Sequence, residues 1–241
     1  MIGLGTIVNV TAVLVGSLIG LIIKGGLKQR FQDIILQSVG LATIFIGAAG
    51  TIQCMFLITE TGIKVSGTIM MPLSLVIGAI IGEAIDIEKR MDQFGSWLKR
   101  NVKSNQDSKF IEGFVTASLV VCIGAMAVVG SIQDGINADP SILYAKSILD
   151  FVIVIIFSST FGKGVMFSAI PLGIYQGTLT LLARFIAPVL NDYIVNNLSF
   201  VGSILIFTIG INLTFGKRIK VGNMLPSLLV VILFSLIVSS I

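Results

Sequence analysis

Eight long apolar runs follow one another along the chain, and this succession limits the fold more than any other feature. Each run is long enough to cross a bilayer as a helix, which needs about 20 residues, and a helix satisfies its own backbone hydrogen bonds in lipid. The runs predict an all-α polytopic membrane helix bundle of about eight transmembrane helices. Seven is the main alternative, because the fifth and seventh runs are the shortest. The runs cover residues 2–23, 34–58, 65–85, 114–132, 143–161, 164–187, 199–215 and 225–241.

The composition also favours a membrane protein. Hydrophobic residues make up 55% of the 241 residues and charged residues only 12%, whereas soluble domains carry roughly 25% charge. A soluble chain of this size would leave much of its apolar surface facing water. This excludes a soluble enzyme, a disordered chain and a nucleic-acid-binding protein. The first run lacks a basic n-region and a cleavage site, so we expect a retained span rather than a signal peptide.

Basic residues predict the orientation. With the N-terminus outside, 13 of the 16 Lys and Arg residues fall in inner loops, as the positive-inside rule requires in a bacterial inner membrane. An odd number of spans would place Lys217, Arg218 and Lys220 on the wrong side. We therefore expect both termini outside.

The longest inner loop, residues 83–112, contains an amphipathic pattern. Ile87, Met91, Phe94 and Leu98 recur at helical spacing, with Trp97 beside them. This predicts a short helix on the inner surface in contact with anionic headgroups. The alternative is a docking site for a soluble partner.

Glycines at matched spacing indicate internal repeats. Spans 1–3 and spans 6–8 show the same series of patterns but enter the membrane from opposite sides, which predicts inverted three-helix repeats joined by two helices. The matched glycines are Gly5, Gly16 and Gly20, then Gly67, Gly78 and Gly82, then Gly162, Gly173 and Gly177. We expect one transmembrane domain over 1–241, with repeat one at 2–85, linking helices and the cytoplasmic amphipathic segment at 86–161, and repeat two at 162–241. The alternative is that glycine-rich helices look alike because close packing needs small residues.

Three small-xxx-small pairs within these repeats predict close helix packing. They are Gly16 with Gly20, Gly78 with Gly82, and Gly173 with Gly177. We expect these contacts within the bundle, and we also expect a homo-oligomer, most simply a dimer.

Polar residues inside the sixth run are the first candidates for a functional site, because such residues are costly in lipid. Pro171 interrupts the helix, and Tyr175 and Gln176 follow close to the middle of the span. A broken helix with an aromatic ring and an amide at its centre indicates a binding element. The alternative is a kinked helix whose Tyr175 and Gln176 bond to neighbouring helices.

Lys146 and Asp150 lie four residues apart on one face of the fifth run. They pair with one another near the outer surface, or Asp150 lines an entry path and takes up a proton or cation. Gln53, Gln133 and Asp134 are expected to line a vestibule, and Glu83 and Asp86 to be solvated at the inner interface. The full set of expected path residues is Asn9, Asp150, Ser158, Ser159, Tyr175, Gln176 and Asn212.

Motifs of enzymes and conventional channels are absent. The chain has no histidine, no Walker A sequence, no potassium-filter sequence, no nucleophile–base pair and no metal-ligand cluster. We expect no catalytic residue, no metal and no cofactor. Cys54 and Cys122 stand apart, without a CxxC motif, and are expected to be packed thiols.

Segments from the first span to the last resemble one known family. Through them the chain resembles the YqgA/YdfK-like bacterial inner-membrane proteins, a domain of unknown function. The resemblance implies a multi-spanning inner-membrane protein and no catalytic residues. Phe151 departs from the small residue expected after Asp150, which puts tight packing of the fifth span in doubt. The segments are Gly5-Thr6-Ile7-Val8-Asn9, Gln133-Asp134-Gly135, Lys146-Ser147 with Leu149-Asp150, Gly162-x-Gly164-Val165, Ser168-Ala169, Tyr175-Gln176-Gly177 and Val221-Gly222-Asn223-x-Leu225-Pro226.

Together these patterns favour a small secondary transporter or channel-like carrier for a small polar solute or ion, with its site near the midplane at the broken sixth span. The alternative is a non-transporting interaction subunit, or the substrate-binding subunit of a larger complex. In either case the expected surroundings are the lipid bilayer, and no nucleic acid.

Overall fold

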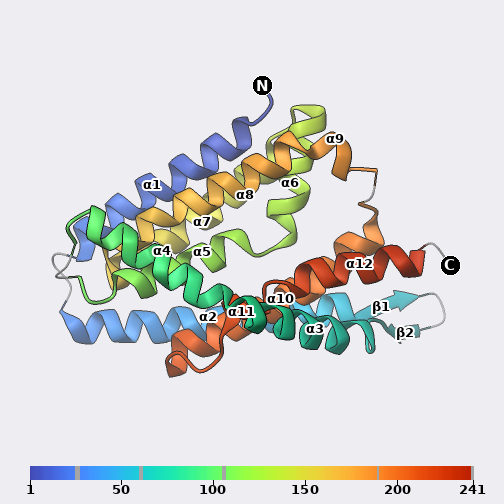
Figure 1. Cartoon of the computed structure of the whole chain (residues 1–241), viewed down its shortest axis with the longest axis horizontal. Helices are drawn as coiled ribbons and strands as arrows, with labels where there is room; N and C mark the ends of the chain where they lie inside the picture. Colours follow the sequence, from blue (N-terminus) through green and yellow to red (C-terminus); the bar gives the residue numbers. More distant parts are fainter. Residues whose placement is uncertain (25–27, 60–61, 105–106, 189, 240–241) are drawn as a thin grey trace. The chain divides into compact units, whose positions relative to one another are not determined.

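The computed structural model describes residues 1–24, 28–59, 62–104, 107–188 and 190–239, and the chain is helical over most of these (Figure 1). A 3-10 helix, η1 (Lys163–Ser168), precedes α8, and β1 (Phe56–Thr59) pairs antiparallel with β2 (Gly62–Val65). The helices are α1 (Leu4–Lys24), α2 (Gln29–Met55), α3 (Met70–Ile85), α4 (Ile87–Asn101), α5 (Phe110–Cys122), α6 (Ala125–Asn137), α7 (Ser141–Phe161), α8 (Ala169–Leu181), α9 (Ala183–Ile186), α10 (Asp192–Phe215), α11 (Val221–Met224) and α12 (Ser227–Ser239).

The expectation of membrane-spanning helices holds for five to seven segments of the described residues. Five are long and apolar enough on their own: α1, α2, α7, α10 and the stretch Val221–Val238. The bent pairs α3 with α4 and α5 with α6 raise the number to seven if each pair is one span. The sixth run, residues 164–187, is divided into η1, α8 and α9. The count of eight therefore stays a prediction.

Helix α1 shows an arrangement opposite to that of a helix on the surface of a soluble protein. Its buried face carries small and polar residues, whereas large apolar side chains such as Ile7, Leu18 and Ile22 point outward. A soluble helix buries its apolar stripe, but lipid removes that driving force, and small residues then line the contacts between helices. The buried residues are Gly5, Thr6, Asn9, Val13, Gly16, Ser17 and Gly20.

The chain divides into two compact units, each made of separate segments. The first unit comprises Met1–Leu36 and Lys89–Pro188, and the second comprises Gln37–Glu88 and Val189–Ile241. The domain division predicted from the repeats stays a prediction.

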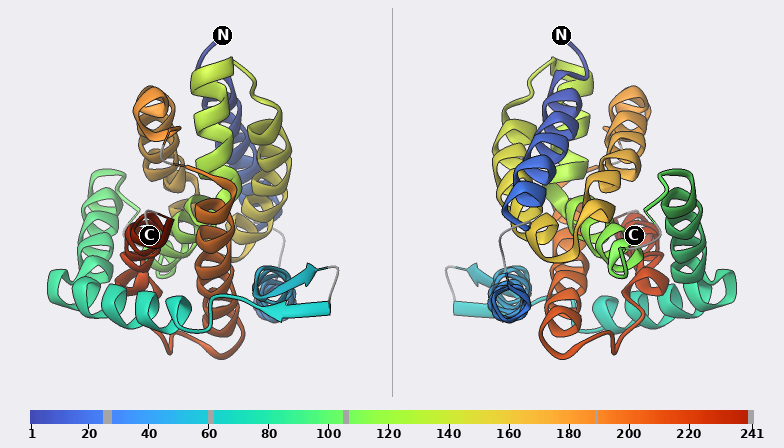
Figure 2. Two further views of the ribbon diagram at one scale, coloured as in Figure 1. Left: turned by 90° about the vertical axis from the view of Figure 1, so that its right-hand side faces the viewer. Right: turned by 90° about the vertical axis from the view of Figure 1, so that its left-hand side faces the viewer.

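In the first unit, α1 and α7 run parallel along their length, blue beside yellow in Figures 1 and 2. Gly5 lies against Leu143, Gly16 against Val154 and Gly20 against Ser158. A Cβ atom at Gly20 would come within 2.3 Å of the Ile155 carbonyl oxygen. The two helices therefore approach too closely for a larger residue at this position.

The predicted amphipathic helix is α4. Its Phe94 ring contacts Phe114 of α5, with 5.7 Å between ring centroids, and stacks on Trp97 at the same distance. Leu98 is buried, whereas Phe94 and Trp97 are exposed. Part of the apolar face of α4 is thus covered by α5, and two aromatic side chains remain uncovered.

In the second unit, α12 packs against α3 and α10. Gly78 lies against Ser227 and Gly82 against Asn223. The other predicted packing pair, on α8 of the first unit, is more open: Gly173 has Val10 3.3 Å from a built Cβ, and Gly177 has no described atom within 4 Å.

Candidate functional site

An ion pair is buried on α7 in the first unit. Lys146 Nζ lies 2.5 Å from Asp150 Oδ2, and the two side chains are only 7% and 5% exposed. One helical turn separates the residues, so both point to the same side of α7. The predicted pair forms, and both of its side chains are buried within the unit.

Two side-chain amides from other helices complete the surroundings of the carboxylate. Asn9 Nδ2 of α1 donates a hydrogen bond to Asp150 Oδ2 at 2.9 Å and another to Gln176 Oε1 of α8 at 3.4 Å. Both amide side chains are fully buried. Three of the predicted path residues, Asn9, Asp150 and Gln176, are therefore brought together, with Lys146 as a fourth member.

The break between α5 and α6 supplies a backbone ligand to the lysine. Gly124, with φ +136°, separates the two helices, a conformation that glycine adopts readily. The last carbonyls of α5 therefore lack partners within the helix, and Lys146 Nζ donates to the Val121 oxygen at 2.8 Å. A positive charge is also favourable at this negative end of the helix dipole. The apolar pattern of the fourth run gave no sign of this contact beyond Gly124 itself.

Some buried polar atoms in this unit lack a described partner. They include Asn9 Oδ1 and Gln176 Nε2 next to the ion pair. Three buried hydroxyl groups also lack a described partner: those of Ser17 on α1, Ser158 on α7 and Ser168 on η1. An unmade hydrogen bond at a buried group costs about 1–3 kcal/mol, so each such atom needs an explanation beyond packing.

Asp134 and Gln133 are not arranged as the expected vestibule. Asp134 is fully buried and accepts a hydrogen bond from the Gly5 backbone N–H at 3.0 Å, at the start of α1. A carboxylate is favourable there because of the helix dipole. Gln133 donates instead to Asp139, whose pKa is lowered mainly by the Ser141 hydroxyl. Gln53 is exposed on α2 in the second unit.

The remaining path candidates have separate surroundings. Ser158 is buried, and Ser159 donates to the Ile156 carbonyl of its own helix. Tyr175 is half-buried beside Gln176 on α8. Asn212 belongs to the second unit, where its Oδ1 accepts from the backbone of Arg218 and Ile219 and its Nδ2 donates to the Ile219 carbonyl. This amide holds the loop after α10.

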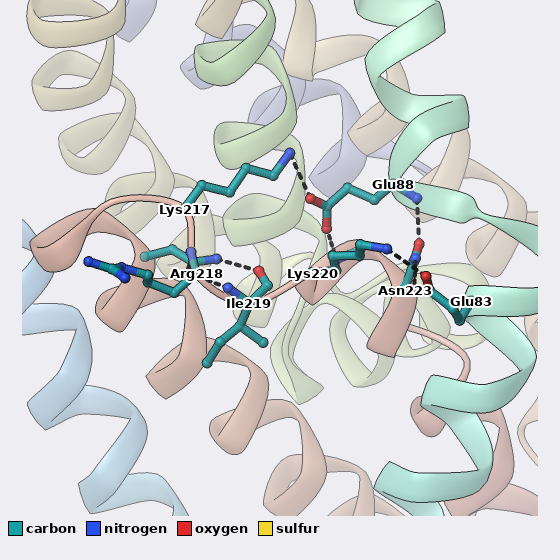
Figure 3. A network of polar contacts seen from close by, with 9 residues as sticks. Glu83, Glu88, Lys217, Arg218, Ile219, Lys220 and Asn223 are labelled. Carbon is teal, nitrogen blue, oxygen red and sulfur yellow. Dashed lines mark hydrogen bonds and ion pairs between the residues drawn. The ribbon is translucent and has the colours of Figure 1, made fainter.

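A second polar network, in the second unit, joins α11 (Val221–Met224) and the loop before it to the end of α3 and the start of α4 (Figure 3). Asn223 donates to Glu83 at 2.7 Å and accepts from the Glu88 backbone N–H at 2.7 Å. Lys220 pairs with Glu83 at 2.5 Å and Lys217 with Glu88 at 2.7 Å. The hydrogen bond that Lys220 donates to the Glu83 carboxylate raises the pKa of Lys220.

This network holds α3, α4 and α11 together and does not form a solute path. Glu88 is buried and also accepts from the Gly222 backbone N–H at 3.1 Å. Glu83 is exposed, as the sequence predicts for a solvated charge, and it also holds two partners across 137 and 140 residues of sequence. Glu88 was not singled out from the sequence, and Asn223 was named only within a segment of the family resemblance. Nothing in their local pattern links positions so far apart.

Comparison with known proteins agrees with the resemblance stated above. The chain is 33% identical over 226 residues to "Uncharacterized membrane protein YdfK" of Bacillus subtilis (strain 168), covering 94% of this chain and 93% of that protein. It is 30% identical over 230 residues to "Uncharacterized protein YqgA" of Escherichia coli (strain K12), with the same shares covered. No solved structure matches the chain significantly. With a family match over residues 4–236, the chain belongs to the membrane-protein family described as "Protein of unknown function (DUF554)".

Proposed function

We propose that the chain is a small secondary transporter or channel-like carrier for a small polar solute or ion. We place it in the bacterial inner membrane with both termini outside. Its path runs through the first unit and passes the Lys146–Asp150 pair. The observation that carries this proposal is the buried Lys146–Asp150 ion pair. Its carboxylate accepts a hydrogen bond from the Asn9 amide of α1, which also bonds Gln176 of α8, and its ammonium group donates to a carbonyl in the last turn of α5.

The energetics favour a functional explanation of this pair. Ionisable residues within membrane-spanning helices are costly and rare, and they mark substrate and ion pathways. A buried ion pair is also weak as a stabilising device, since apolar residues of the same volume often stabilise as well or better. Stability alone therefore does not account for Lys146 and Asp150.

Polar groups continue along α1 on both sides of the ion pair. Thr6 lies next to Thr180 of α8, with 3.4 Å between their hydroxyl oxygens. Asn9 follows at the ion pair, and Ser17 lies two turns further along the same buried face. At about 1.5 Å per residue, Thr6 and Ser17 are separated by roughly 16 Å along the helix. These groups form a polar stripe through the unit, as a solute path requires.

The packing of the helices supports inverted repeats. Each helix of the first predicted triplet lies antiparallel to its counterpart in the second: α1 on α8, α2 on α10, and α3 on α12. Inverted repeats in transporters place the site at the interface between repeats, and α1 and α8 carry Asn9 and Gln176. The approaching positions are Thr6 with Thr180 and Asn9 with Gln176; Gly40 with Thr214 and Gly50 with Ser203; Gly78 with Ser227 and Gly82 with Asn223.

Flux in proteoliposomes tests the proposal, with protons, alkali cations, small anions and amino acids as the panel. We expect wild type to move one class of solute and Asp150→Asn to reduce that flux at least tenfold, because the variant leaves the path without its negative charge. The matched control is Asp139→Asn, in the loop between α6 and α7, which keeps its acceptor oxygen for Ser141. Absence of any flux from folded wild type would contradict the proposal.

The uncovered aromatic residues of α4 favour a second candidate, a non-transporting interaction subunit. Phe94 is 41% and Trp97 51% exposed, beside the basic residues Lys99 and Arg100. This candidate predicts a stoichiometric partner that co-purifies from native membranes and is lost on charge reversal at Lys99 and Arg100. Purification of the chain without such a partner would contradict it.

A further inference from the structure

We propose that the ligand of this site is a monovalent cation, and that the Lys146 ammonium group is a tethered competitor for the same position. This inference rests on the proposed function and names its substrate class. It follows from the atoms that surround Lys146 Nζ and from the charge they carry.

The groups around Nζ are oxygen ligands suited to a hard cation. Lys146 Nζ contacts Asp150 Oδ2 at 2.5 Å and the Val121 carbonyl oxygen at 2.8 Å. Two further oxygens belong to the neighbouring amides, and neither has a described contact with Nζ. Asn9 Oδ1 is buried without a described partner, and Gln176 Oε1 accepts a long 3.4 Å hydrogen bond from Asn9. Carboxylate, carbonyl and amide oxygens are the donors preferred by alkali and alkaline-earth ions. Free carbonyls at the end of a broken membrane helix bind coupling cations in the same way.

Charge sets the class and number of ions. Asp150 provides one negative charge at this position, and the Lys146 ammonium already balances it. An uncompensated charge in a buried site is very costly, so the site holds one monovalent cation at a time. Entry of an ion therefore requires the lysine to withdraw, which its flexible four-carbon side chain permits. An anion would be repelled by the Asp150 carboxylate, because the Lys146 ammonium group is already paired with that carboxylate.

Lysine variants test the competition directly. Purified protein is titrated with sodium, potassium or rubidium chloride, with choline chloride holding the ionic strength constant, and the thermal unfolding midpoint is recorded. We expect Lys146→Gln to show a saturable rise in the midpoint, half-maximal at a concentration about tenfold or more below that of wild type, because a tethered competitor acts at millimolar or higher effective concentration. Lys146→Arg, which keeps a permanent charge, is expected to show no greater sensitivity than wild type.

A double variant separates the cation site from loss of fold. Lys146→Gln with Asp150→Asn keeps polar side chains but removes both charges, so it is expected to fold and to show no specific cation effect. If Lys146→Gln unfolds in choline, rescue by alkali cations supports the inference. Failure of alkali cations to stabilise Lys146→Gln beyond choline, or the same response in the double variant, overturns it.

Rubidium uptake distinguishes this inference from the proposed function. If wild-type proteoliposomes move another solute while Lys146→Gln gains no cation response, the cation site is refuted and transport stands. If Lys146→Gln responds to rubidium ions while no solute crosses the membrane in any variant, the cation site stands and transport is refuted.

Discussion

Asn9 links three helices through one amide group, and this gives a prediction for a single side chain. Its Nδ2 bonds both Asp150 and Gln176, so Asn9→Ala leaves a buried carboxylate with fewer partners. We expect a loss of about 1–3 kcal/mol in the free energy of unfolding, measured by denaturant titration in detergent. Thr11→Ala is the matched control, because Thr11 is exposed on α1 and bonds only the Ile7 carbonyl of its own helix. An equal loss in both variants would contradict the role of Asn9.

Single residues also show what a sequence can and cannot reveal about a site. Asn9, Asp150 and Gln176 were identifiable because a polar side chain within an apolar run is costly in lipid. Asn212 satisfied the same criterion, yet its amide holds a nearby loop, and hydropathy does not distinguish these outcomes. The Val121 carbonyl gave no signal at all, because every residue carries such a group. Its availability depends on a break at Gly124.

Close approach of α3 to α11 gives a prediction for helix packing. A Cβ atom at Gly82 would lie 1.8 Å from the Asn223 carbonyl oxygen, whereas one at Gly177 on α8 meets no described atom within 4 Å. We expect Gly82→Ala to destabilise by about 1–3 kcal/mol or more, and Gly177→Ala to be neutral or to stabilise by up to about 1 kcal/mol. Thermal unfolding of the two variants checks this. A large loss in Gly177→Ala would mean that a second copy packs on α8.

The bounds of helices were predicted well where an apolar run is uninterrupted. They were predicted less well where a break in the backbone sets the end of the helix. The runs 2–23 and 143–161 agree closely with α1 and α7. The second and third runs overlap the β1–β2 hairpin, because the period of a short apolar segment does not separate strand from helix. In the sixth run, Pro171 lies in the first turn of α8, where its missing N–H costs no helical hydrogen bond. The break precedes it, at η1.

The grouping of helices into two units follows from contacts that no local pattern encodes. Each unit joins two segments that are far apart in the sequence: residues 1–36 with 89–188, and residues 37–88 with 189–241. Ties such as Gly5 with Asp134 and Glu83 with Asn223 cross more than 120 residues of sequence. The glycine repeats gave the only indication of such pairing. They did so because close packing of membrane helices selects small residues at the contact positions.

The number of membrane crossings is a prediction for the whole chain. It depends on whether the segment that contains α8 spans the bilayer. Helix α8 runs antiparallel along α1, with Thr180 beside Thr6 and Gly173 beside Val10. The six residues of η1 at about 2.0 Å each and the thirteen of α8 at about 1.5 Å each add up to roughly 31 Å. The 21 residues of α1 span the same length. If α1 crosses the bilayer, this segment crosses too, which favours eight spans over seven.

Cysteine accessibility tests that count in cells whose outer surface is exposed. Single cysteines replace Arg100, Asn137, Asp192 or Arg218 in a Cys54→Ser, Cys122→Ser background, and an impermeant maleimide is applied. Eight spans with external termini predict labelling at 137 and 192 and protection at 100 and 218, with all four labelled after permeabilisation. If the sixth segment does not cross, every later element changes side, so 192 would be protected and 218 labelled. That result would also remove the opposed orientation of the two triplets. Span 7 would then enter the membrane from the same side as span 2, and span 8 from the same side as span 3.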